Sequence, residues 1–193
     1  MITSAPNCTG KLRLRLLFLA MLALLGPLEG ATQNRPVSRE YQLKAAILYK
    51  FVGFIEWENN ESQVDGKPDI EICIIGTSPF GSALERMASL EPIQTKHIIV
   101  RTSLRAEEAG SCDLAFISSS EAANLPRILA EMAPRPCVTV SDIPRFAELG
   151  GTIELFREGQ FIRFNINTSQ MREKGVRLSS QLLALAKQVI GNE

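Results

Sequence analysis

The feature that most constrains the fold of this 193-residue chain is a series of short apolar segments that alternate with helical segments. The first, IEICII, is apolar along nearly its whole length. Strands of this kind occur in parallel sheets that are covered by helices on both faces. The expected strands are Ile70–Ile75, Lys96–Arg101, Asp113–Ser118 and Cys137–Ser141, with helices at Phe80–Leu90 and Ser120–Ala133 and a short helix or loop at Ala106–Gly110.

Different patterns flank this alternating region. Ser38 can cap a helix that runs to about Trp57, and two adjoining apolar stripes predict that this helix is buried on two sides. Near the other end, Thr152–Arg157 and Gln160–Asn165 flank the dipeptide Glu158-Gly159. That arrangement predicts an antiparallel hairpin with a two-residue turn.

A last helix is expected from Thr168 or Ser169 to about Ile190, because leucines and a valine recur at helical spacing. The elements together predict an α/β fold. We expect a single three-layer domain, with a mostly parallel central sheet, a C-terminal antiparallel hairpin and flanking helices. The apolar stripe of the last helix consists of Leu178, Leu182, Leu185 and Val189.

The beginning of the chain has the layout of a secretory signal peptide. Three basic residues precede an apolar run from Leu16 to Leu25, and Gly26, Pro27 and Gly30 then break it. The run is too short for a helix that must cross about 30 Å of hydrocarbon. We expect cleavage between Gly30 and Ala31, which divides the chain into a signal peptide, residues 1–30, and an α/β domain, residues 31–193. The alternative is an uncleaved membrane anchor.

The charge of the mature chain argues against some partners. The full chain has 21 basic and 21 acidic residues, and the predicted signal peptide takes away three basic residues and one acidic residue. The 18 basic and 20 acidic residues that remain give a net charge of −2. Nucleic acids and anionic membranes usually require a basic patch, so neither is an expected partner. No later apolar run is long enough to insert directly into a membrane.

The sequence offers no catalytic or metal-binding pattern. The only histidine, His97, lies in an expected strand, and the turn Gly76–Phe80 lacks the second glycine of a nucleophile elbow. The mature cysteines, Cys73, Cys112 and Cys137, show no paired-ligand spacing for zinc. We therefore expect a protein that is not an enzyme and holds no cofactor. In an oxidising compartment the three cysteines are compatible with one disulfide and one free thiol, or with buried structural thiols.

Weak indications of a ligand site lie at the carboxyl ends of the expected strands. The turn Gly76–Gly81 opens a helix, so its backbone N–H groups can bind an anion. Ser78 and Ser118 would lie on the same rim. Arg177, on a polar shoulder of the expected last helix, can anchor an anion or a partner. Each feature has a structural alternative, because serines often cap helices and an arginine can lie over apolar neighbours.

Three further residues are candidates for contact with a protein partner. Trp57 ends the first helix between two glutamates, and amphipathic tryptophans recur at contact surfaces. Packing in the core is the alternative for this side chain. Phe161 and Arg163 lie in the expected hairpin, where they could form part of a binding surface.

Segments along nearly the whole mature chain, taken together and in order, resemble the YfiR-like family of periplasmic regulators from Gram-negative bacteria. The resemblance is carried by three groups of residues. They are Tyr41–Phe51 with Phe54–Trp57, then Ile72–Gly76 with Pro79–Gly81, and finally Val138–Asp142 with Gly150-Gly151, Ile162–Asn167 and Leu178–Ala186.

The resemblance implies a small α/β domain that dimerises and regulates rather than catalyses. Family members bind the periplasmic domain of an inner-membrane diguanylate cyclase and repress it, and a peptidoglycan-associated outer-membrane lipoprotein can sequester them. Envelope or redox state is thereby linked to cyclic di-GMP signalling and biofilm formation. The alternative function is a periplasmic small-ligand-binding module that serves another membrane receptor or sensor.

The resemblance also implies a disulfide between Cys73 and Cys112, because both match cysteine positions of the family. The expected strand alignment puts these two residues about three positions out of step. Cys137 is then left unpaired.

Overall fold

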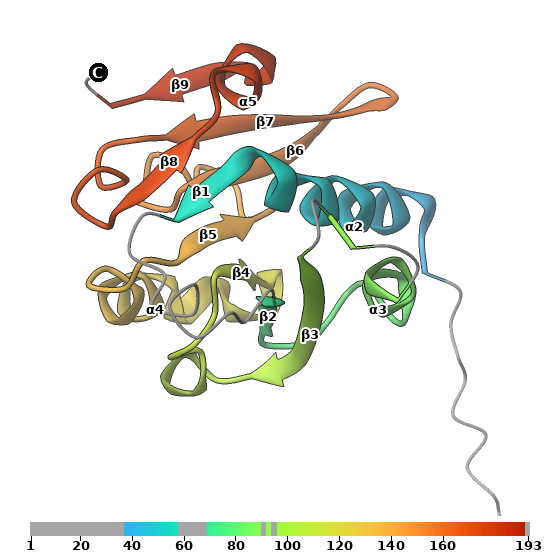
Figure 1. Ribbon diagram of the computed structural model, residues 1–193. Coiled ribbons are helices and arrows are strands. Elements are labelled where there is room, and N and C mark those ends of the chain that lie inside the picture. The colour runs from blue at the N-terminus through green and yellow to red at the C-terminus, as the bar shows by residue number, and fades with distance from the viewer. Residues whose placement is uncertain (1–36, 58–68, 90–91, 94–95, 192–193) are drawn as a thin grey trace, which may run out of the picture. The chain divides into compact units, whose positions relative to one another are not determined.

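A seven-stranded sheet lies at the centre of the part of the chain that the computed structural model describes, residues 37–57, 69–89, 92–93 and 96–191 (Figure 1). Its strand order is β3-β2-β4-β5-β6-β7-β9. Neighbouring strands are parallel except for the antiparallel pair β6 and β7, which confirms the expected sheet. The strands are β2 (Asp69–Ile75), β3 (His97–Leu104), β4 (Leu114–Ile117), β5 (Val138–Ser141), β6 (Ile153–Glu158), β7 (Phe161–Asn167) and β9 (Gln188–Ile190).

Helices cover both faces of this sheet because its central strands are apolar on both sides. Side chains that alternate along a strand point to opposite faces. Along β2, Ile72 packs into one cluster with α2 and α3, whereas Cys73 packs into a second cluster with η3 and α4. The result is the expected three-layer architecture. The helices are α2 (Arg39–Phe51), α3 (Ala83–Ala88), η3 (Ala106–Glu108), η4 (Ser119–Asn124) and α4 (Leu125–Met132), of which η3 and η4 are 3₁₀ helices.

The first helix ends earlier than expected. Ser38 caps α2 by accepting a hydrogen bond from the Tyr41 amide at 3.3 Å, as the sequence indicates. A 3₁₀ turn, η1 (Val52–Phe54), follows the helix, and the chain then forms strand β1 (Ile55–Trp57). The prediction of a helix up to Trp57 was therefore wrong. In β1 the buried and exposed side chains alternate with the period of a strand, and β8 supplies an antiparallel hydrogen-bonding partner.

The predicted last helix was also wrong. In its place lie a series of turns, strand β8 (Val176–Leu178), the short helix α5 (Ser180–Leu185) and strand β9. Gly175 has a φ of +64°, so the backbone leaves helical geometry directly before β8. The pairing of β8 with β1, side by side in Figure 1, and of β9 with β7 outweighs the helical spacing of the leucines.

The hairpin forms with its turn one residue later than expected. Glu158 pairs directly with Phe161, so the two loop residues are Gly159 and Gln160. The predicted turn, Glu158-Gly159, was wrong by one position because Glu158 is still paired with the opposite strand. Gly159 has a φ of +62°, a conformation that glycine adopts without steric cost.

Other element boundaries also differ from the expected ones. Helix α3 is shorter than the expected Phe80–Leu90, and β3 continues three residues beyond Arg101. The expected helix Ser120–Ala133 begins as the 3₁₀ helix η4 and becomes regular only at Leu125, next to a proline in the first helical turn. The expected signal peptide lies outside the described residues.

Candidate functional site

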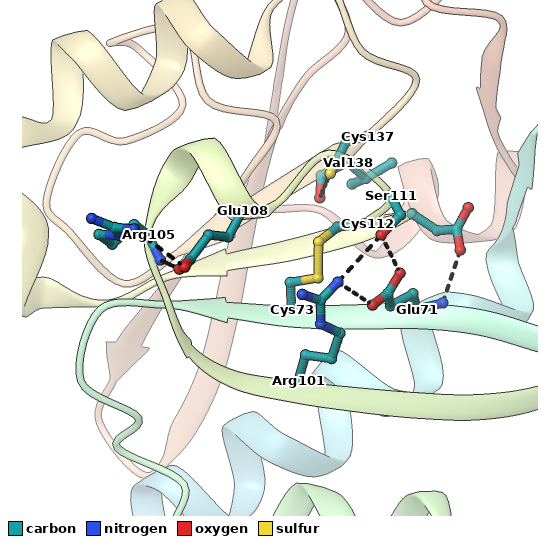
Figure 2. The surroundings of a disulfide bond; sticks show 10 residues. Glu71, Cys73, Arg101, Arg105, Glu108, Ser111, Cys112, Cys137 and Val138 are labelled. Carbon is teal, nitrogen blue, oxygen red and sulfur yellow. Dashed lines mark hydrogen bonds and ion pairs between the residues drawn. A yellow bond between two sulfur atoms is a disulfide. The ribbon is translucent and has the colours of Figure 1, made fainter.

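A disulfide joins Cys73 of β2 to Cys112, which lies two residues before β4 (Figure 2). In the strand register Cys73 lies opposite Ala115, so Cys112 is indeed three positions out of step. The bridge forms nevertheless, because the chain turns just before β4 and brings the two Cα atoms to 5.9 Å. The pairing that the family resemblance implies is therefore confirmed, and both side chains are buried.

A group of polar side chains lies beside the disulfide, as Figure 2 shows. Glu71 accepts hydrogen bonds from Arg101 at 2.8 Å and from Ser111 at 2.6 Å. Burial alone would raise the pKa of Glu71, but these hydrogen bonds and the charge of Arg101 hold the pKa below its ordinary value. The Glu71 amide donates to Asp113 at 2.8 Å, and burial raises the pKa of Asp113. These contacts fix residues 111–113 against β2 in addition to the disulfide.

Cys137 is a free thiol inside the core. Burial raises its pKa to about 12. The thiolate is the reactive form of cysteine, so at neutral pH this side chain behaves as a small apolar residue rather than a nucleophile.

Of the three candidate ligand residues, Ser78 and Ser118 follow the adjacent parallel strands β2 and β4, as the predicted rim requires, whereas Arg177 lies in the other sheet. Ser118 caps η4 by accepting a hydrogen bond from the Ser120 amide, and Ser78 accepts one from the Phe80 amide in the turn before α3. Arg177 lies on strand β8, opposite Glu56, rather than on a helix. The prediction that Arg177 lies on the polar side of a helix was therefore wrong. The hydroxyl groups of Ser78 and Ser118 each accept a hydrogen bond from a backbone amide.

The crevice where folds of this class often bind ligands lies between the carboxyl ends of β2 and β4, since the chain order reverses there. Ser120 accepts a hydrogen bond from the Thr77 amide at 3.0 Å across this position. A Cβ atom on Gly76 would lie only 2.5 Å from the Ser120 hydroxyl oxygen. Ser120 therefore engages one of the backbone amides that an anion at this position would need.

The candidate partner residues lie in two different environments. Trp57 is 5% exposed and belongs to the core, with the Lys96 ammonium 5.6 Å from its ring centroid. Phe161 is 65% exposed at the start of β7, and the Arg163 guanidinium lies 5.3 Å from its ring centroid. We call Phe161, Arg163 and their neighbour Glu158, which pairs with Arg163 at 3.5 Å, the hairpin surface.

A buried ion-pair network, which sequence reasoning missed, connects α2 to the end of β5. The Lys44 ammonium lies 2.6 Å from Glu40 and 2.7 Å from Asp142. Burial alone would lower the pKa of Lys44, but hydrogen bonds to Asp142 and Glu40 raise it above its ordinary value. The signal in the sequence was a lysine inside an apolar stripe, next to Ala45, since a charge in that position needs a partner.

Neither a metal site nor a membrane span emerges from the described residues. Among them, no group of three or more histidine, cysteine, aspartate or glutamate side chains could hold a metal ion. None of the helices described is both long enough and apolar enough to cross a bilayer.

The geometry defines a class of protein: a small α/β domain with a buried disulfide and a β-hairpin that exposes an aromatic residue. Comparison with known proteins gives the family. The family model described as YfiR/HmsC-like matches residues 41–187, and the chain belongs to that family. Its members are periplasmic regulators of diguanylate cyclase signalling.

A solved structure supports the fold. The crystal structure of a conserved domain protein from Vibrio cholerae O1 biovar El Tor is similar with a TM-score of 0.51 and 9% sequence identity. The similarity covers 77% of this chain and 60% of that one. At this identity the likeness concerns the fold alone. No curated protein sequence matches the chain.

Proposed function

We propose that this protein is a periplasmic regulator that binds the periplasmic domain of an inner-membrane diguanylate cyclase and holds the enzyme inactive. Membership of the YfiR/HmsC-like family supports the signalling role. The disulfide supports a place outside the cytoplasm, because such bonds persist in oxidising compartments. Regulation by binding needs no catalytic group.

The observation that carries the binding role is the hairpin surface. Phe161 is the most exposed aromatic side chain among the residues that the structure describes. It lies in the hydrogen-bonded β6–β7 hairpin, and its ring contacts the guanidinium of Arg163. Aromatic residues and arginine dominate binding energy at protein interfaces. A side chain that is already ordered loses less conformational freedom when a partner covers it.

Regulation follows if different partners compete for the protein. A repressor shifts the cyclase toward an inactive conformation only by binding that conformation more tightly. An outer-membrane peptidoglycan-associated lipoprotein that captures the repressor would release the cyclase. In this scheme the protein acts as a homodimer, and the Cys73–Cys112 disulfide makes the interaction sensitive to reduction.

The test uses the mature protein, residues 31–193, and the purified periplasmic domain of the diguanylate cyclase from the same organism. We expect a stable complex and lower cyclic di-GMP synthesis by the full-length cyclase. Phe161→Ala should weaken the complex about 30-fold, the effect of losing an interface hot spot. Leu149→Ala is the matched control, since Leu149 is also an exposed apolar side chain but lies in a turn outside the hairpin.

The outcomes separate the parts of the proposal. If the wild-type protein binds no cyclase domain, the repressor function is wrong. If both variants bind as tightly as the wild type, the regulator function survives but the hairpin surface is not its interface. If reduction dissociates the wild-type complex and the Cys73→Ala/Cys112→Ala variant, which cannot form the bridge, also fails to bind, the disulfide is a redox switch.

A further inference from the structure

A small pocket opens between the start of α2 and the inner face of the β6–β7 hairpin. It encloses about 180 Å³. The pocket lies on the opposite face of the hairpin from Phe161, because Ile162 is adjacent to Phe161 in the strand and neighbouring side chains alternate between faces. It is therefore separate from the hairpin surface. Its lining residues are Arg39, Glu40, Leu43, Arg157, Gln160 and Ile162.

The charges around this pocket do not balance. Glu40 is the one acidic lining residue, and it is engaged by the buried Lys44 at 2.6 Å and more loosely by Arg157 at 3.8 Å. Lys44 in turn is shared with Asp142. The guanidinium of Arg39 makes no ion pair or hydrogen bond with the described part of the chain. Three cations and two carboxylates leave one positive charge, and two of the cations, Arg39 and Arg157, line the pocket.

The dimensions and the apolar walls limit what can fill the pocket. Sites for small-molecule ligands usually enclose about 300 Å³ or more, so this one is better suited to a single side chain. Leu43, which is 43% exposed, and the partly buried Ile162 provide an apolar wall beside the arginines. A carboxylate can form two parallel hydrogen bonds with a guanidinium, which favours an acidic side chain over a neutral one.

We propose that this pocket docks an acidic side chain of a protein partner, presented next to an apolar residue of the same partner segment. The carboxylate pairs with Arg39 and Arg157, and the apolar neighbour packs on Leu43 and Ile162. The inference concerns the chemistry of a second contact surface and does not depend on the partner being a cyclase.

The test uses two short peptides as probes, acetyl-Leu-Glu-Leu-amide and its Leu-Gln-Leu counterpart, with the mature isotope-labelled protein. NMR titration should show shifts for residues of the pocket with a Kd of about 1 mM for the acidic peptide, and at least tenfold weaker binding of the neutral one. Acetate alone should bind more weakly than the acidic peptide. No shifts with the acidic peptide, equal binding of both peptides, or acetate binding as tightly as the peptide would each overturn the proposal.

Two variants with the same change in charge, one in the pocket and one outside it, test whether the acidic peptide binds in the pocket. Arg39→Glu should abolish binding of the acidic peptide without harming the fold, because an acidic residue is favourable in the first turn of a helix. Arg172→Glu, an exposed position in the turn before β8, makes the same change in charge outside the pocket and should retain binding. If Arg172→Glu weakens binding as much as Arg39→Glu, the effect is one of overall charge and the pocket is not the site.

Discussion

Lys44 is the most deeply buried charged residue among those that the structure describes. It is 3% exposed, and its ammonium contacts two carboxylates and lies 4.7 Å from the Tyr41 ring centroid. A buried charge is tolerated only when partners replace the water that it loses. Because Asp142 follows β5 and Lys44 belongs to α2, the pair fixes the helix against the end of the central sheet.

Lys44→Met should destabilise the protein by about 3 kcal/mol, because the change leaves Asp142 buried without its cation. Urea unfolding of the mature protein measures the loss. Lys50→Met is the control, since Lys50 is exposed in the last turn of the same helix and should cost only a few tenths of a kcal/mol. Adding Asp142→Asn to Lys44→Met should recover part of the stability. Equal unfolding midpoints for the two lysine variants would contradict this role.

Glu71 should make the stability of the protein depend on acid. Its folded-state pKa is below the ordinary value because Ser111 and Arg101 donate hydrogen bonds to the carboxylate, against the opposite effect of burial. A carboxyl group whose pKa is lower in the folded protein than in the unfolded chain stabilises the fold while it is ionised. This stabilisation is fully present above the pKa of the unfolded chain, and it is lost as the pH falls through the pKa of the folded protein. Glu71→Gln should therefore lose less stability than the wild type between pH 5 and pH 3.

Urea unfolding midpoints at several pH values measure how the stability of the wild type and of Glu71→Gln depends on pH. Burial raises the pKa of Asp113 in both proteins, whereas the charge of Glu71 adds to this rise only in the wild type, so Asp113 reduces the expected difference. Parallel pH curves for wild type and Glu71→Gln would show that Arg101 and Ser111 do not hold the ionised carboxylate.

The sequence correctly predicted the central strands of the sheet, but it did not predict the short strands β1, β8 and β9 near the two ends of the domain. Apolar runs such as Ile70–Ile75 are buried on both faces, so their local pattern and their environment agree. The segment from Leu178 to Val189 has helical spacing, yet Leu185 and Val189 are exposed and β9 pairs with β7. Short strands that depend on a distant partner leave no periodic signal of their own.

The turn of the hairpin gives a prediction for one element. Gly159 has a positive φ, and a Cβ atom there would meet nothing within 4 Å, so a substitution costs only backbone strain. Gly159→Ala should destabilise the protein by about 1 kcal/mol. Gly159→Asn should cost less, because asparagine tolerates this conformation better. Thermal unfolding compares the two variants, and an alanine variant at least as stable as the asparagine variant would contradict the assigned turn.

For the whole molecule, the sequence predicted the layers but only part of the candidate site. The Cys73–Cys112 pairing came from family resemblance, since the strand register, which puts the two residues three positions out of step, argued against it. The ligand role of Ser78 and Ser118 stays a prediction, because a hydroxyl group that accepts a hydrogen bond from a nearby amide looks the same in a sequence as one that binds a ligand. The pocket beside Arg39 could not be predicted, because it joins segments more than a hundred residues apart.

Export is the last prediction, and it connects the sequence to the disulfide. The apolar run from Leu16 to Leu25 is about half the length that a membrane-spanning helix needs, which favours removal of residues 1–30 over anchoring. Mass spectrometry of the protein from the periplasmic fraction should give a chain that begins at Ala31, with Cys73 and Cys112 oxidised. The same chain made in the cytoplasm without residues 1–30 should carry these cysteines as thiols, because that compartment is reducing. Recovery of the intact N-terminus in the membrane fraction would instead establish an uncleaved anchor.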